Sequence, residues 1–238
     1  MIYGAILAGG MGQRMTQAVV PKQFLEIEGE AIIWIAIKKM LSVERFDKLI
    51  IAMHPEWSDY LEKMLAIKLG KKYSRIVVID GGSTRLQSIE NILSTIEKDG
   101  FHDDDVVILH DAVRPFVTKK LLENSIDATL KHQAVGVAAP VVDTMFWVEN
   151  GTIQSMPDRD HLFHGQTPEG FHVQTLKKAL EQLTPQERDT ITGTVQICMV
   201  KGIPIHIISG DNENFKITSD SDFAMAQAYI KAGLDETR

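Results

Sequence analysis

The chain has 238 residues, of which 44% are apolar and 24% are charged, an ordinary balance for a globular protein. Its net charge of −7 argues against a general nucleic-acid binder, so an anionic ligand would have to meet locally placed cations. The single cysteine, Cys198, excludes an intramolecular disulfide framework, and its apolar neighbours predict an inert buried thiol. No apolar run approaches the ~18 residues of a membrane span, and the N-terminus lacks the basic start of a secretory signal. We therefore expect a cytoplasmic enzyme.

The first 22 residues combine a short apolar run with a glycine-rich loop. Residues 2–7 have the size expected for a buried strand, and GGMG follows at residues 9–12. Adjacent glycines let backbone N–H groups approach an anion that a Cβ would hold off. Arg14 and Lys22 add two cations, so the loop has the features of a polyphosphate site. A glycine-rich turn with two solvated cations is the alternative, and neither the P-loop pattern nor the dinucleotide fingerprint fits.

From residue 31 to residue 132 the pattern alternates between helices and strands. Helices are expected at 31–41, 56–69, 84–98 and 118–132, and strands at 48–53, 76–79 and 106–109. Thr118 can cap the last of these helices through its hydroxyl. The alternation predicts an α/β fold with a right-handed, mostly parallel central sheet whose strand-end loops gather at one edge.

The regular alternation of helices and strands ends after residue 134. Extended segments are expected at 135–142 and 144–148, and Asn150-Gly151 predicts a hairpin that returns at 152–156. This hairpin is too short to bury its own apolar side chains, so we interpret it as a projecting β-arm that packs on a partner subunit. The later elements expected are helices at 173–183, 187–200 and 221–232 and a strand at 205–208. One domain over residues 1–238, with the arm at about 140–160, is the simplest account.

Two further loops carry polar residues at strand ends. In GGSTRLQS, residues 81–88, a glycine pair again opens a helix, and Ser88 offers a hydroxyl to a ligand; an ordinary βα turn is the alternative. In LHDAVRPF, residues 109–116, Asp111 ends an apolar strand, a usual place for a carboxylate that holds Mg²⁺ against phosphates. Arg114 would brace this loop or the ligand. The acidic run at 103–105 precedes the strand, so we expect a solvated turn at the opposite edge.

The last group of polar residues lies late in the chain. Arg159 and Lys216 are cations that would suit a second, smaller anion such as a phosphomonoester. They accompany the strings QTP at 166–168 and NFKIT at 214–218. The eight histidines show no metal-binding spacing, so a structural or exposed role is expected for them.

Taken together, these strings resemble one known family. In chain order they are LAGGMGQRM, PKQF, GGSTRLQS, HDAVRPF, VDTM, DRDHLFHGQTPEGF and NFKIT. The same strings occur in this order in the cytidylyltransferases of small polyol phosphates, which act on 2-C-methyl-D-erythritol 4-phosphate or D-ribitol 5-phosphate. The resemblance covers about residues 2–231. It implies a Rossmann-like nucleotidyltransferase fold, CTP as substrate, Mg²⁺ as cofactor, and a homodimer made through the arm, with neither nucleic acid nor membrane as a partner.

The resemblance also implies roles for individual residues. The CTP-binding residues that it implies are Leu7, Ala8, Gly9, Gly10, Gly82, Ser83, Arg85, Ser88, Ala112 and Arg114. The catalytic cations that it implies are Arg14, Lys22, Arg159 and Lys216, and Asp111 would bind the metal. The acceptor-binding residues that it implies are Thr144, Arg159, Thr167 and Lys216. Arg159 and Thr144 would reach into the site of the partner subunit.

Several details favour the ribitol branch, namely the opening MIYGAILAGG and the strings HLFHGQTP and VQICMVKG, while VVDTM is shared with the erythritol branch. The expected reaction is therefore cytidylyl transfer from CTP to D-ribitol 5-phosphate, giving CDP-ribitol for teichoic acid biosynthesis. The alternative acceptor is 2-C-methyl-D-erythritol 4-phosphate of isoprenoid biosynthesis. Remoter alternatives are a sugar nucleotidyltransferase that uses another NTP and a non-catalytic nucleotide-binding protein. Two positions depart from the family pattern: Glu169 replaces a common glutamine, and Gly193 replaces an aspartate.

Overall fold

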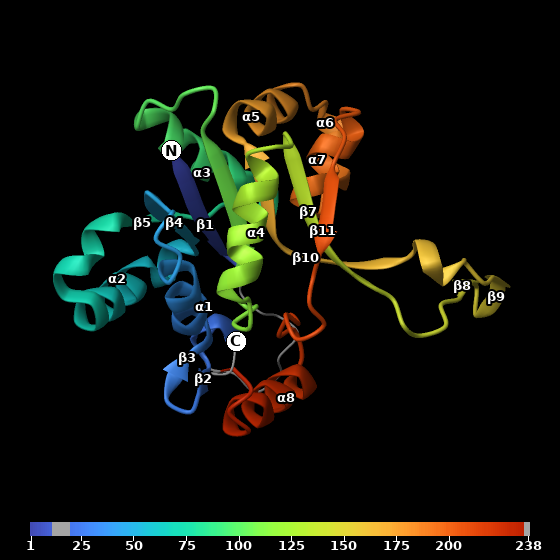
Figure 1. The fold of residues 1–238 in the computed structure, drawn as a ribbon, viewed down its shortest axis with the longest axis horizontal. Coiled ribbons are helices and arrows are strands. Elements are labelled where there is room, and N and C mark those ends of the chain that lie inside the picture. Colours follow the sequence, from blue (N-terminus) through green and yellow to red (C-terminus); the bar gives the residue numbers. More distant parts are fainter. Residues whose placement is uncertain (11–19, 236–238) are drawn as a thin grey trace.

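The computed structural model describes residues 1–10 and 20–235. The described residues form a seven-stranded sheet in which β10 runs antiparallel to both of its neighbours and the other pairs run parallel (Figure 1). In sheet order, the strands are β11 (His206–Ser209), β7 (Ala134–Pro140), β10 (Phe163–His172), β6 (Val106–Asp111), β1 (Ile2–Ala8), β4 (Lys48–Met53) and β5 (Ile76–Asp80). The mixed α/β fold with a mostly parallel sheet is thus confirmed.

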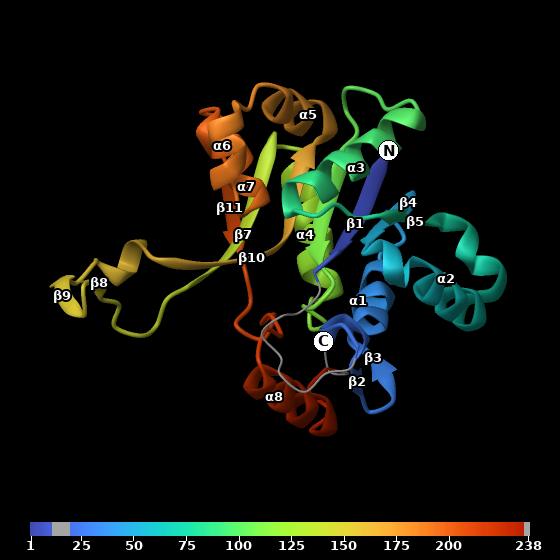
Figure 2. The same cartoon turned by 180° about the vertical axis from the view of Figure 1, so that it is seen from behind.

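Helices cover both faces of this sheet, as the two opposite views show (Figures 1 and 2). One face carries α1 (Ile32–Leu41), α2 (Pro55–Leu69) and α4 (Lys119–Thr129), and the other carries α3 (Arg85–Lys98), α5 (Val173–Glu181) and α7 (Thr194–Val200). Apart from the elements between β7 and β10, which are described below, the remaining elements are η1 (Lys22–Phe24), β2 (Glu26–Ile27), β3 (Glu30–Ala31), η2 (Gly70–Arg75), α6 (Pro185–Thr190) and α8 (Asp220–Lys231). Each face of the sheet therefore has its own apolar core.

The buried strands and capped helices follow directly from the sequence. Every residue of β6 is buried, because helices cover both faces of the sheet. A parallel strand in this position must be apolar along most of its length. Thr84 and Thr118 cap α3 and α4 by accepting hydrogen bonds from backbone amides of the first helical turn, each at 3.1 Å. The loops before α3 and α4 directly follow β5 and β6, so they lie at the carboxyl ends of these parallel strands.

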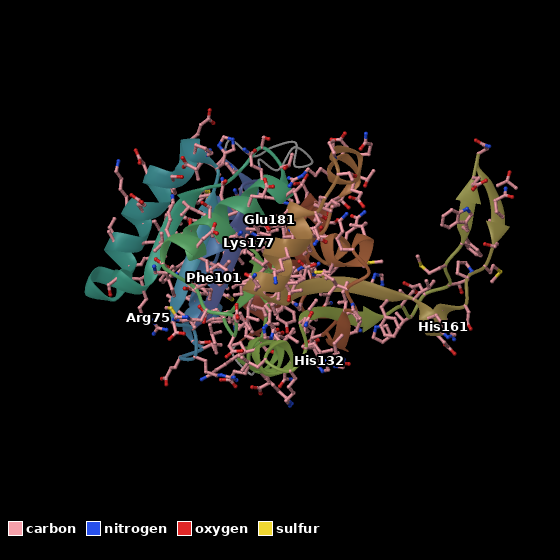
Figure 3. All side chains as sticks on the ribbon, turned by 90° about the horizontal axis from the view of Figure 1, so that it is seen from above. Arg75, Phe101, His132, His161, Lys177 and Glu181 are labelled. Atoms are coloured by element: carbon pink, nitrogen blue, oxygen red, sulfur yellow. The ribbon has the colours of Figure 1, made fainter. Side chains whose placement is uncertain are left out.

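The predicted hairpin forms an arm that stands away from the body (Figure 1). Its strands are β8 (Trp147–Glu149) and β9 (Thr152–Ser155), and all their residues are exposed. Asn150 and Gly151 have φ values of 50° and 75°, the left-handed pair that a two-residue turn of this kind requires. Figure 3 shows the arm from above, with His161 of the short helix η3 (Arg159–His161) on the chain that leads back to the body.

Strand β10 was missed by the sequence analysis. Its segment FHGQTPEGFH contains two glycines and a proline, residue types that weaken strand signals. The pairing of β10 with β7 shifts register between Gln166 and Gly170, so the strand tolerates these residues through an irregularity. The result is an antiparallel strand in the middle of the sheet, next to β6.

Three other expectations need correction. The single helix expected at 187–200 is two helices, α6 and α7, because Ile191 and Gly193 adopt extended backbone conformations between them. Helix α4 ends at Thr129 rather than near residue 132. The acidic turn at 103–105 does lie at the edge opposite the site, but Asp105 is buried and pairs with the N-terminal amino group.

Candidate active site at the carboxyl edge of the sheet

A pocket lies at the edge where β1 and β6 end, and we call it the strand-end pocket. Its volume is about 220 Å³. It is lined by Leu7, Ala8, Gly9, Gly10, Lys22, Gln23, Gly82, Ser83, Thr84, Arg85, Ser88, Asp111, Ala112, Val113 and Lys216. Four segments that are far apart in the sequence, all singled out by the sequence analysis, therefore meet at one place. This is the position at which open α/β sheets bind their ligands.

The first side of the pocket is the end of β1 with the helix η1. Gln23, which is 1% exposed, donates a hydrogen bond from Nε2 to the carbonyl oxygen of Ala8 at 2.9 Å. Phe24 packs against Trp57 of α2 with a ring-centroid distance of 5.1 Å. These two contacts fix η1 against the body, so that Lys22 at its start lines the pocket. The predicted residue Arg14 lies outside the described residues.

The second side is the loop that enters α3. Ser88 accepts a hydrogen bond from the backbone N–H of Gly82 at 3.0 Å and donates one to the carbonyl oxygen of Thr84, also at 3.0 Å. A Cβ on Gly82 would lie 2.3 Å from Cβ of Gln87, so only glycine fits this turn without a shift. Ser88 thus shapes the loop, and its contact with a nucleotide stays a prediction.

The third side centres on Asp111, which is 5% exposed at the end of β6. Its carboxylate lies 2.7 Å from Nη1 of Arg85, 2.9 Å from Nζ of Lys216 and 3.6 Å from Nε of Arg114. Burial alone would raise the pKa of the Asp111 carboxyl, but the ion pairs with Arg85 and Lys216 outweigh it and hold that pKa well below its usual range. Asp111 is therefore a carboxylate at neutral pH.

Arg85 connects Asp111 to a second buried carboxylate. Nη2 of Arg85 lies 3.2 Å from Oε2 of Glu169, which is 7% exposed on β10. Burial raises the pKa of Glu169, and the Arg85 guanidinium opposes this shift. Glu169 was noted in the sequence as a departure from the family pattern and not as a site residue, because β10 was not predicted.

The site suits Mg²⁺ better than a metal held by protein ligands alone. Among the residues that the structure describes, no three histidine, cysteine, aspartate or glutamate side chains gather to hold a metal ion. Asp111 supplies one hard carboxylate oxygen donor group beside the pocket. Magnesium in nucleotide sites is commonly bound by one or two carboxylates together with substrate phosphates and water, so a single carboxylate fits that ion.

The other predicted site residues lie outside the lining of the pocket. Arg114 is buried and donates to the carbonyl oxygens of Asn214 and Gly165, at 2.8 and 3.3 Å. Of the two roles predicted for it, bracing the loop or bracing the ligand, these contacts support the first. Thr167 is buried in β10. Thr144 and Arg159 are exposed on the arm, where Nη1 of Arg159 donates to the carbonyl oxygen of Val142 at 3.4 Å. Their roles toward an acceptor stay predictions.

This geometry agrees with the comparisons to known proteins. The sequence model of the 2-C-methyl-D-erythritol 4-phosphate cytidylyltransferase family, IspD, matches residues 2–232. The chain belongs to the IspD family. It is accordingly a cytidylyltransferase, a nucleotidyltransferase that takes CTP as its substrate.

Solved IspD structures share its fold. The 2-C-methyl-D-erythritol 4-phosphate cytidylyltransferase of Francisella tularensis has 27% sequence identity and a TM-score of 0.78, with 95% of this chain and 99% of that chain covered. The 4-diphosphocytidyl-2C-methyl-D-erythritol synthase of Anaerococcus prevotii DSM 20548 has 23% identity and a TM-score of 0.79, with 97% of this chain and 96% of that chain covered. The comparisons favour the methylerythritol acceptor that the sequence analysis gave as its alternative, and nothing in them supports ribitol phosphate or teichoic acid synthesis.

Two further results concern the predictions about membrane spans and about the single cysteine. The described residues contain no helix long and apolar enough to cross a membrane. Cys198 is fully buried, and burial, with a smaller contribution from Glu169, raises the pKa of its thiol to about 12. The expectation of a buried thiol is thus confirmed, and the raised pKa agrees with an inert one.

Proposed function

We propose that this IspD-family chain transfers a cytidylyl group from CTP to the phosphate of a small polyol phosphate, with 2-C-methyl-D-erythritol 4-phosphate as the first candidate. The observation that carries the proposal is the meeting of two glycine-rich loops, Lys22, Lys216 and the Asp111 carboxylate in one pocket. The loops offer backbone N–H groups to the nucleotide, and the lysines offer charge to its phosphates.

In the proposed reaction, a phosphate oxygen of the acceptor attacks the α-phosphorus of CTP in line. A new P–O bond forms, the bond from the α-phosphorus to the bridging oxygen of the β-phosphate breaks, and pyrophosphate leaves with that electron pair. A phosphomonoester with a second pKa near 6 is already ionised at neutral pH, so the reaction needs no general base. The chain must instead bring two anions together and counter the charge that develops between them.

Each polar residue then has a task. Lys22, together with Arg14, would counter the charge on the α-phosphate, and Lys216 would bind the acceptor phosphate. Asp111 would hold Mg²⁺, which supplies positive charge to the phosphates of the bound nucleotide. Arg85 forms ion pairs with both Asp111 and Glu169, and these two contacts support a fixed orientation of the Asp111 carboxylate.

We further propose that a second copy of the chain completes the site. Thr144 and Arg159 are exposed residues of the segment between β7 and β10 that carries the arm, and neither lines the pocket of its own chain. The arm exposes apolar side chains that a second copy could cover, among them Phe146, Trp147 and Ile153, which are 49%, 59% and 54% exposed. A dimer formed through this arm would bring Arg159 to the acceptor side of the partner's pocket.

A second acceptor has its own support. The strings MIYGAILAGG, HLFHGQTP and VQICMVKG favour D-ribitol 5-phosphate. The two acceptors differ in the polyol and share the phosphate, so the same cations would bind both.

The test is pyrophosphate release from CTP with a panel of acceptors: 2-C-methyl-D-erythritol 4-phosphate, D-ribitol 5-phosphate and D-ribose 5-phosphate. The first should give the highest kcat/KM, and a higher value for ribitol phosphate would transfer the assignment to that branch. Replacing CTP by UTP, ATP or GTP should lower the rate strongly. Equal rates with ATP and CTP, or no release with any polyol phosphate, would contradict the proposed function.

A further inference from the structure

His110 has no role in the proposed reaction, although it directly precedes Asp111. The structure describes all eight histidines, and His110 is the one whose side chain is fully buried. Nε2 of its ring lies 2.9 Å from the carbonyl oxygen of Arg114, and Nδ1 lies 3.0 Å from Oγ1 of Thr167. Oγ1 of Thr167 in turn accepts the backbone N–H of Asp111 at 3.1 Å. The ring thus belongs to a buried chain of hydrogen bonds around the Asp111 loop.

With a neutral imidazole, the Arg114 end of these hydrogen bonds sets their direction. The carbonyl oxygen of Arg114 can only accept, so Nε2 of His110 carries the single ring proton and Nδ1 is an acceptor. The hydroxyl of Thr167 then donates to Nδ1, while its oxygen accepts the backbone N–H of Asp111. The arrangement satisfies all four groups with a neutral imidazole. Burial lowers the pKa of His110 to about 4, in agreement with that charge state.

We propose that His110 and Thr167 are positioning residues, which hold the Asp111 loop so that its carboxylate faces the strand-end pocket. The role of Asp111 in this statement rests on the proposed function. The chain of hydrogen bonds fixes the loop at both ends, at the amide of Asp111 and at the carbonyl group of Arg114. Between these ends, Ala112 and Val113 line the pocket.

Thr167 can serve this purpose because β10 runs antiparallel beside β6. Its side chain reaches across from β10 to the end of β6, and its carbonyl oxygen accepts a hydrogen bond from Nδ2 of Asn214 at 2.7 Å. Asn214 is fully buried and lies two residues before Lys216. The same threonine therefore connects Asp111, the proposed metal ligand, and the segment of Lys216, the proposed acceptor-binding lysine, to one strand. This contact pattern differs from the acceptor contact that the family resemblance implies for Thr167.

The matched variants Thr167→Val, Thr167→Ser and Thr129→Val test the proposal. Valine removes the hydroxyl and keeps the shape, whereas serine restores the hydroxyl. Thr129 is an equally buried threonine on α4, whose hydroxyl donates to the carbonyl oxygen of Ser125. Loss of a group that orients a metal ligand costs about 10- to 100-fold in activity or metal affinity, so kcat of Thr167→Val should fall by that factor. Its KM for CTP should change little, Thr167→Ser should recover most of the loss, and Thr129→Val should lower only the melting temperature.

A nitrogen NMR spectrum of the histidine rings gives a readout that needs no activity. The His110 signals, identified by their absence in His110→Gln, should show protonated Nε2 and unprotonated Nδ1 at neutral pH. The Nδ1 signal should shift in Thr167→Val and stay in place in Thr129→Val. A protonated Nδ1, or equal kcat values in Thr167→Val and Thr129→Val, would overturn the proposal. A wild-type enzyme without cytidylyl transfer would instead contradict the proposed function, while the NMR signals would still report on the chain of hydrogen bonds.

Discussion

Lys216 Nζ lies 2.9 Å from Asp111 Oδ2, so the lysine proposed to bind the acceptor phosphate contacts the carboxylate proposed to bind the metal. Arg85 holds the other oxygen of the same carboxylate at 2.7 Å. Each oxygen of the Asp111 carboxylate therefore has a cationic side chain beside it. Because the ion pairs hold the pKa of Asp111 low, its charge persists throughout the neutral pH range.

Replacing Asp111 by asparagine should abolish most of the activity. The Asp111→Asn change keeps the shape and removes the charge, and metal-held charge stabilisation supplies several kcal/mol, so we expect kcat to fall by about two orders of magnitude or more. Pyrophosphate release at saturating CTP, acceptor and Mg²⁺ measures it. Asp103→Asn, at an exposed position on the opposite edge, is the matched control and should keep wild-type activity. Near-normal turnover of Asp111→Asn would refute the metal assignment.

The arm should determine the oligomeric state. Phe146→Glu places a charge among the exposed apolar side chains of the arm, so it should convert a dimer to a monomer in sedimentation equilibrium. Ile67→Glu changes a side chain that is 85% exposed on α2 and should leave the dimer intact. A monomeric wild-type chain at micromolar concentration would contradict the dimer proposal.

Subunit mixing should show whether Arg159 acts in the partner's site. Lys22 lines the pocket of its own chain, whereas Arg159 does not. A dimer of one Lys22→Ala chain and one Arg159→Ala chain would then have one site with both changes and one with neither. After full random exchange, about a quarter of wild-type activity should return, because half of the dimers are mixed and each has one intact site. No recovery despite confirmed exchange would show that Arg159 acts within its own chain or not at all.

His110 should make the stability of the protein depend on pH in mild acid. Burial lowers its pKa from 6.5 to about 4 in the folded chain. Between these values the unfolded chain binds a proton that the folded chain does not, so the free energy of unfolding falls as the pH falls through this window. The full contribution is about 3 kcal/mol. Urea unfolding of His110→Gln between pH 7 and 4.5 should give a shallower dependence than the wild type. His102→Gln, at an exposed position, should not change it, and parallel curves for all three proteins would contradict the prediction.

The sequence alone determined much of the fold and the identity of the site loops. Strand β4 has the bounds that its apolar run predicted, and Thr118 caps α4 as expected, because burial on both faces and capping are local requirements that a short segment displays. Lys22, Gly82, Asp111 and Lys216 were all singled out from glycine pairs, strand ends and cations, and the structure brings them into one pocket.

Only the tertiary structure decided how these loops are held together. Strand β10 carries glycine and proline in place of a strand pattern, and its pairing with β6 and β7 supplies what its own sequence does not indicate. With β10 come Glu169 beside Arg85 and Thr167 beside His110, contacts between residues far apart in the chain. Such contacts arise from long-range packing in a buried environment, where a polar group must find a partner across the fold. For that reason the sequence did not separate His110 from the other seven histidines, whereas its full burial in the folded chain does.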